Sequence, residues 1–182
     1  MAEHLAVIQL GHPLLRQRAT AIADSQSDRI QTLIDDLILT VQQANGVGIA
    51  APQTARSERL FIVASRPNPR YPTAPEMAPT AMINPTIVGH STDMEKGWEG
   101  CLSVPGIRGL VPRYTTIQVE YTGRDGNLYQ QELTHFVARI FQHELDHLNG
   151  LVFLDRVEGP QDLMTEQEYQ ARIMRPALPS AG

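Results

Sequence analysis

The spacing of apolar residues predicts two amphipathic helices and one polar helix. From about residue 27 to residue 45, apolar residues recur at the i, i+3, i+4 and i+7 positions of a helix that buries one face. A similar pattern over residues 136–148, followed by Asn149-Gly150 as a C-terminal stop, predicts a second helix. A third helix is expected over residues 162–175, where the chain is polar. The first helix is expected to have only a packing role.

Between the first two helices the chain has the pattern of short strands and loops. Residues 116–122 alternate apolar and polar side chains, and a Gly- and Asn-containing turn joins them to residues 128–133. This arrangement predicts a β-hairpin. Further strands are expected over residues 59–65, 82–84 and 86–88, and loops over residues 46–53 and the proline-rich stretch 66–79.

Length and composition exclude several classes of protein. At 182 residues the chain can bury a sizeable core in one domain. The formal net charge of −5 comes with no long basic run, which argues against direct binding of nucleic acid. No stretch approaches the ~18 consecutive apolar residues of a membrane span, and the first residues lack the pattern of a signal peptide. With a single cysteine no intrachain disulfide can form, so a cytoplasmic location is expected.

The second predicted helix carries His143, Glu144 and His147, which have the spacing of a metal site. Residues four positions apart lie on one helical face, one turn apart, so both imidazoles can bind one ion. Glu144 would lie within reach of a water on that ion, where a carboxylate can act as a general base. The alternative is a helix whose two histidines face only solvent or a polar contact.

Two other segments are candidates to complete this site. Residues 46–53 contain two glycines, two alanines and a proline, so a ligand or another part of the backbone could approach them closely. The alternative for this segment is a tight structural turn. At its end, Gln53 could direct an amide donor at a developing oxyanion. Cys101 could be a ligand or nucleophile, and its ordinary alternative is a buried, inert thiol.

A catalytic metal usually has three protein ligands and one open position, so a third ligand is needed. Phe153 occupies the position of the third histidine of metzincins, which excludes that class. Cys101 and Glu166 both remain candidates, and the softness of a thiolate toward Zn or Fe(II) favours Cys101. A zinc peptidase that uses Glu166 and a non-catalytic module with a closed structural metal site are the alternatives. Structural sites often use paired cysteines, so the single cysteine argues against the latter.

Three short stretches of this sequence form a recognisable set. They are Gly46-x-Gly48-x-Ala50-Ala51-Pro52-Gln53, Glu99-Gly100-Cys101-Leu102-Ser103 and Gln142-His143-Glu144-x-Asp146-His147. Together and in this order they closely resemble the three motifs of peptide deformylases, and the likeness covers about residues 13–155. The resemblance implies an α+β fold with antiparallel sheets around the helix that carries the histidines. The chain length predicts a single catalytic domain over residues 1–182, and a disordered tail is expected from about residue 176.

The activity implied by the resemblance is hydrolysis of a linear formamide. The formyl group would be removed from the N-terminal formylmethionine of newly made polypeptides, releasing formate. Cys101, His143 and His147 would hold one divalent metal, typically Fe(II) in this family, with Zn, Ni or Co able to replace it.

The resemblance also assigns catalytic and substrate-binding roles. Glu144 would be the general base, the Gln53 amide and the Leu102 backbone N–H would stabilise the oxyanion, and Gly48 would bond the formyl region. The positions expected to contact substrate are Val47, Gly48, Glu99, Gly100, Arg108, Phe136 and Ile140. Phe136 and Ile140 are expected to form walls of an apolar methionine pocket because they lie on the helical turns before His143.

Two segments depart from the family pattern. The proline-rich stretch 66–79 is a loop variation whose role the sequence does not indicate. The C-terminal segment is acidic and rich in glutamine, unlike the basic helix that some bacterial members use at the ribosome. The implied partners are therefore the N-formylmethionyl peptides of nascent chains, and direct docking at the ribosome is in doubt.

Overall fold

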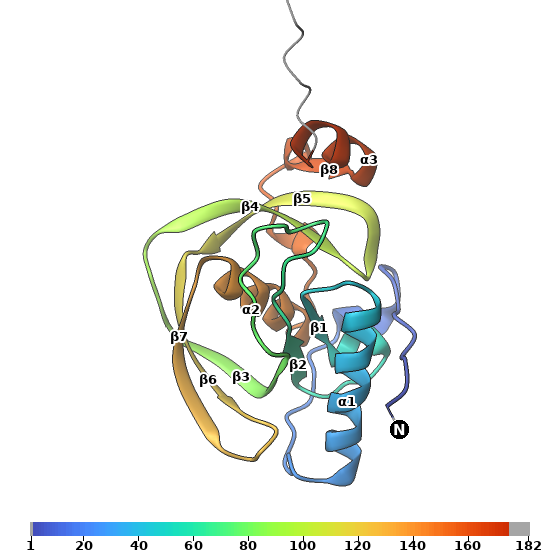
Figure 1. The fold of residues 1–182 in the computed structure, drawn as a ribbon, viewed down its shortest axis with the longest axis vertical. Helices are drawn as coiled ribbons and strands as arrows, with labels where there is room; N and C mark the ends of the chain where they lie inside the picture. Colours follow the sequence, from blue (N-terminus) through green and yellow to red (C-terminus); the bar gives the residue numbers. More distant parts are fainter. Residues whose placement is uncertain (1, 175–182) are drawn as a thin grey trace, which may run out of the picture.

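A computed structural model describes residues 2–174, so the tail predicted from about residue 176 lies outside the described residues. Helix α2 (His135–Leu148) lies at the centre, and strands of two sheets curve around it (Figure 1). One sheet has the order β1-β2-β3-β6-β7 and the other the order β4-β5-β8. All neighbouring strands are antiparallel, which confirms the predicted α+β architecture.

The other elements follow in chain order. The helices are α1 (Asp28–Gln43) and the short α3 (Glu166–Tyr169). The strands are β1 (Gly48–Ala50), β2 (Leu60–Val63), β3 (Thr80–His90), β4 (Met94–Cys101), β5 (Val104–Tyr114), β6 (Thr116–Thr122), β7 (Leu128–Thr134) and β8 (Leu163–Thr165).

Helix α1 forms as predicted because its apolar residues share one face. Ile30, Ile34 and Val41 are fully buried and belong to a core cluster that includes residues of β1 and β2. Burying a side chain of this size stabilises the fold by about 1.5–3 kcal/mol. After the helix, Asn45 adopts a left-handed conformation with φ of 50°, which ends it near the predicted stop.

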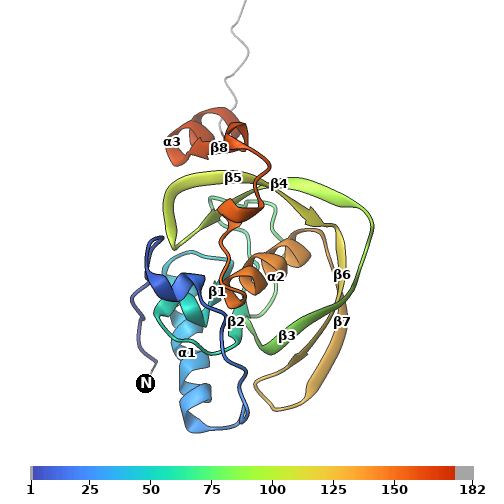
Figure 2. The ribbon, with the colours of Figure 1, turned by 180° about the vertical axis from the view of Figure 1, so that it is seen from behind.

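Helix α2 is held by a second core cluster. Ala138, Phe141 and Leu148 pack in this cluster with residues of β2, β3 and β6. Phe141 meets Phe61 of β2 edge to face, with ring centroids 5.1 Å apart, a favoured aromatic geometry. The packing fixes the rotation of α2, and the view from behind shows the helix enclosed between the two sheets (Figure 2).

The prediction of a loop over residues 46–53 was wrong. Residues 48–50 form strand β1, and a 3₁₀ turn follows at Ala51–Thr54. Small residues carry little strand signal of their own, so β1 depends on its pairing with β2, in which Gly48 lies opposite Val63.

The two strands predicted over residues 82–84 and 86–88 are one strand, β3. Its pairing with β6 shifts register next to Asn84, which has φ of 50°, and Pro85, which has no N–H to donate. The prediction of two separate strands was thus wrong, because a bulge allows the strand to continue.

Strands β4 and β5 were not predicted, and the C-terminal helix was predicted too long. The first part of the segment 162–175 is strand β8, which pairs with β5 around Arg108. Helical structure begins only at Glu166 and continues as a π-helical turn over Gln170–Met174, while residue 175 lies outside the described residues. Pairing with β5 holds residues 163–165 in an extended conformation, so the helix starts only after them. In the described part of the chain, no helix combines the length and apolar character needed to cross a bilayer.

Candidate active site

His143 and His147 of α2 lie beside Cys101, the last residue of β4. Their ligand atoms all lie within 4.8 Å of one another, and Sγ of Cys101 is 3.3 Å from Nε2 of His147. The tight turn between β4 and β5 brings Cys101 to the helix, since Cys101 pairs with Val104 across it. Glu166, the alternative third ligand, lies elsewhere: its carboxylate accepts hydrogen bonds from Arg108.

The Cys-His-His set fits a divalent metal. On a tetrahedral ion with metal–sulfur and metal–nitrogen bonds of about 2.3 and 2.0 Å, sulfur and nitrogen would lie roughly 3.5 Å apart. The observed 3.3 Å between Cys101 and His147 is close to that value. One thiolate and two imidazoles are borderline-soft donors that suit Fe(II) or Zn, and they leave a coordination position for water or substrate.

Glu99 orients His143. Its Oε2 accepts a hydrogen bond from Nδ1 of His143 at 2.9 Å, which leaves Nε2 of that ring for a metal. Arg113 binds both carboxylate oxygens of Glu99 at 2.9 and 3.0 Å, and Arg139 donates to one of them at 2.9 Å. Burial alone would raise the pKa of Glu99, but the charge of Arg113 and the bond from His143 hold it well below its usual range. Although predicted to contact substrate, this carboxylate is engaged with protein groups.

Glu144 has the surroundings of a general base. The residue is buried, and its Oε2 has no hydrogen-bond partner within residues 2–174. Burial raises the pKa of Glu144 to about 7, because the charged form loses its hydration. Gly48 of β1 lies directly over this carboxylate: a Cβ there would overlap Glu144 and come within 2.9 Å of Ile140. Only glycine therefore fits at position 48 without displacing the carboxylate.

The side-chain amide of Gln53 is anchored at both ends. Its Oε1 accepts from the backbone N–H of Ala50 at 2.9 Å, which fixes the orientation of the amide. Its Nε2 donates to Oγ of Ser103 at 3.2 Å and lies 3.4 Å from Sγ of Cys101. An N–H group is therefore held beside the metal-binding set.

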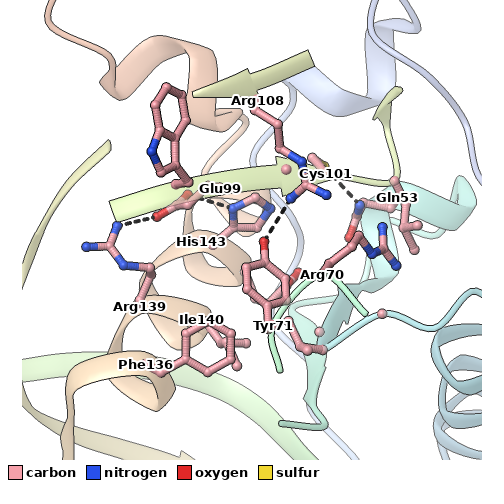
Figure 3. Close-up of a pocket in the computed structure, with 17 residues that line it drawn as sticks. Gln53, Arg70, Tyr71, Glu99, Cys101, Arg108, Phe136, Arg139, Ile140 and His143 are labelled. Carbon is pink, nitrogen blue, oxygen red and sulfur yellow. Dashed lines mark hydrogen bonds and ion pairs between the residues drawn. The ribbon is translucent and has the colours of Figure 1, made fainter. Parts of the chain in front are cut away.

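One cavity of about 50 Å³ joins these groups (Figure 3). Every residue predicted for the site lines it except His147, whose Nε2 lies 3.3 Å from Sγ of the lining residue Cys101. Five lining residues were not among the predicted site residues: Gly46, Arg70, Tyr71, Trp98 and Arg139. Of these, Arg139 had a usable signal, since it lies one helical turn before His143. The others lie in an irregular loop or in an unpredicted strand.

Comparison with known proteins agrees with this geometry. The family profile described as polypeptide deformylase matches residues 4–162. The chain belongs to the peptide deformylase family. Members of this family are metal-dependent hydrolases that remove N-formyl groups from newly made polypeptides, and this chain is an enzyme of that class. The resemblance seen in the three sequence motifs is confirmed.

Similar family members cover almost the whole chain. Peptide deformylase 2 of Nostoc sp. is 66% identical over 173 residues, which are 95% of this chain and 97% of that protein. The class I type b peptide deformylase of Acinetobacter baumannii, solved with Met-Ala-Ser bound, has a TM-score of 0.84 and 45% identity over 86% of this chain and 100% of its own. The Synechococcus elongatus peptide deformylase in complex with actinonin has a TM-score of 0.78 and 34% identity, covering 87% of this chain and 81% of its own.

Proposed function

We propose that this chain deformylates the N-formylmethionyl ends of nascent chains in the cytoplasm, in the cavity beside α2. One observation carries the proposal. One cavity is lined by Cys101 and His143 of the Cys-His-His donor set, by a buried carboxylate whose Oε2 has no partner among the described residues, and by an anchored amide donor. Each group corresponds to one requirement of formamide hydrolysis.

Cys101, His143 and His147 would hold the metal, with Fe(II) as the native ion and Zn, Ni or Co as possible replacements. When bound, such an ion lowers the pKa of a water toward 7 and polarises the formyl oxygen. Glu99 supports this set by holding His143 in the tautomer whose Nε2 is free. Arg113 and Arg139 keep Glu99 ionised so that it can accept that hydrogen bond.

Glu144 is the proposed general base. Its Oε2, which has no partner in the part of the chain that the structure describes, takes a proton from the water that attacks the formyl carbon. The same proton then passes to the amine nitrogen as the carbon–nitrogen bond breaks, giving formate and a free N-terminus. A carboxyl group whose pKa lies near the working pH is suited to both transfers.

The developing oxyanion would be met by two donors, the Nε2–H of Gln53 and the backbone N–H of Leu102. Preorganised donors of this kind are each worth about 3–4 kcal/mol in the transition state. The anchoring of Gln53 by Ala50 supports the assignment, because the amide needs no reorganisation during the reaction. Leu102 lines the same cavity.

Specificity for formyl over acetyl would be steric. Gly48 and Ile140 lie against Glu144, so little room remains for a methyl group on the reacting carbon. Val47, Gly100, Arg108 and Phe136 line the rest of the cavity and would contact the peptide. The segment β8–α3 packs on β5 and uses Glu166 internally, so the proposal includes no docking of that segment at the ribosome.

Release of the free N-terminal amine, accompanied by formate from the formyl peptide, tests this function in anaerobically purified protein. We expect turnover of formyl-Met-Ala-Ser and no measurable turnover of acetyl-Met-Ala-Ser, because the extra methyl group collides beside Gly48. Comparable turnover of both peptides would contradict the steric argument and favour a less selective amidohydrolase. A metal-loaded protein inactive on both would contradict the proposed function itself.

A further inference from the structure

Tyr71 is one of the residues that line the cavity, although it belongs to the proline-rich loop (Figure 3). Its ring packs against Phe136 of α2, with centroids 4.9 Å apart. Its hydroxyl accepts a hydrogen bond of 3.1 Å from Nη1 of Arg108 on β5. Tyr71 thus bridges two elements that line the cavity on different sides.

The loop is anchored around this tyrosine. Nη2 of Arg70 donates to the carbonyls of Ala44 and Asn45, at 3.0 and 2.7 Å, just after α1. The backbone N–H of Tyr71 donates to Oδ1 of Asn68 at 3.1 Å. These contacts tie the loop to the end of α1, so the position of Tyr71 is defined by the fold.

Arg108 is in turn held from behind by the C-terminal segment. Its Nε and Nη2 donate to the carboxylate of Glu166 at 2.5 and 3.3 Å, and its guanidinium lies 4.9 Å from the ring centre of Tyr169. Arg108 is 2% exposed, and its guanidinium packs closely on Gly100: a Cβ there would lie 2.5 Å from Nη1 and would displace the guanidinium. The guanidinium of Arg108 is therefore held in one position, from which it donates to the hydroxyl of Tyr71.

We propose that Tyr71 is the outer wall of the pocket for the first side chain of the peptide, and that Arg108, held by Glu166, keeps this wall in place. The inference rests on the proposed function. The cavity of about 50 Å³ has room for on the order of four water molecules, which suits a narrow, unbranched side chain better than an aromatic ring. The rings of Tyr71 and Phe136 pack against each other and form one continuous wall of this space, so Tyr71 excludes wide side chains.

The test compares kcat/KM for formyl-Met-Ala-Ser with that for formyl-Phe-Ala-Ser. In Tyr71→Ala the Met-to-Phe ratio should fall at least about tenfold, the usual scale of discrimination by an apolar pocket. The change should arise mainly in KM, because the metal ligands and Glu144 are untouched. Glu166→Gln keeps the wall but weakens its support, so the ratio should fall about threefold, as expected for one weakened hydrogen bond.

Tyr129→Ala is the matched control. Tyr129 lies on β7, outside the cavity lining, where its hydroxyl donates to Asp125, so the ratio should stay at the wild-type value. Metal content and thermal unfolding establish that each variant is folded. If Tyr71→Ala proves unfolded, Tyr71→Leu replaces it with the same expectation.

The outcomes separate this inference from the proposed function. An active wild type with an unchanged ratio in the folded Tyr71 variant would overturn the assignment of the wall. A changed ratio there but none in Glu166→Gln would overturn the supporting role of Arg108. A wild-type protein that releases no formate from either peptide would instead refute the deformylase proposal.

Discussion

Replacing Arg113 by methionine should be among the most destabilising single changes in this fold. Arg113 is 4% exposed, and its guanidinium binds Glu99 through two hydrogen bonds and Asp146 through one of 2.6 Å. Methionine fills a similar volume but leaves both buried carboxylates without this partner. Breaking a buried ion pair in this way costs roughly 3–5 kcal/mol.

Glu99 and Asp146 keep other partners in this variant, so the expected loss of stability lies at the lower end of that range. Glu99 keeps Arg139 and His143, and Asp146 keeps two hydrogen bonds from Arg156 at 2.7 and 3.2 Å. We therefore expect a loss of about 3 kcal/mol in the free energy of unfolding. For a chain of this size the corresponding fall in Tm is about 6–12 °C.

Urea and thermal unfolding of the Ni-loaded protein would measure this loss, with Arg156→Met as the matched control. Arg156 belongs to the same network, but its side chain is 46% exposed, so its loss should cost at most about 1 kcal/mol. Equal destabilisation by the two variants would refute the reasoning, since it would mean that burial of the ion pair does not determine its energetic weight.

Further predictions concern the metal site and the C-terminal segment. Glu144→Gln should keep its metal and lose about 10²–10⁴-fold in turnover, which is the usual contribution of a general base. His147→Ala should lose both metal and activity. Metal analysis distinguishes the two variants, and a metal-free Glu144→Gln would contradict the assigned roles. The Fe(II) form should lose activity in air as iron or Cys101 oxidises, while the Ni form persists; equal lifetimes would argue against this assignment of ion or thiolate. The bond from Arg108 lowers the pKa of Glu166, so the stability from this pair is present above the unfolded pKa of glutamate, near 4.5, and is lost as pH falls through the lower folded value. Wild type should therefore exceed Glu166→Gln in Tm at pH 7, and the difference should vanish in acid.

Local sequence patterns were sufficient to predict the two long helices and part of the site. In α1 and α2 the helical period of apolar residues specifies which face is buried, so neighbouring positions such as His143 and His147 acquire their relative placement from the helix itself. The three motifs identified the family and, with it, the sheets around α2. Strands built from small residues, such as β1 at Gly48, carried no such pattern and needed a partner strand to form.

Residue spacing left both Cys101 and Glu166 open as the third ligand; the family resemblance implied Cys101, and the tertiary structure shows that Cys101 is the one beside the histidines. The softness of a thiolate favours Cys101. The number of residues between two segments, however, does not say how far apart they lie in the folded chain. The turn between β4 and β5 places Cys101 beside the histidines, and pairing of β8 with β5 places Glu166 on Arg108 instead.

The same limit applies to Arg113 and Tyr71. Arg113 lies on a strand that the apolar pattern did not predict. Its contribution to stability depends on two carboxylates, which belong to β4 and α2. Tyr71 lies in a proline-rich loop whose conformation is set by contacts with α1 and β5. The sequence by itself determined the chemistry available along α2, because helical geometry is local. Which distant side chains surround the groups on α2 depends on the tertiary structure, because strand pairing and loop anchoring act between segments far apart in the sequence.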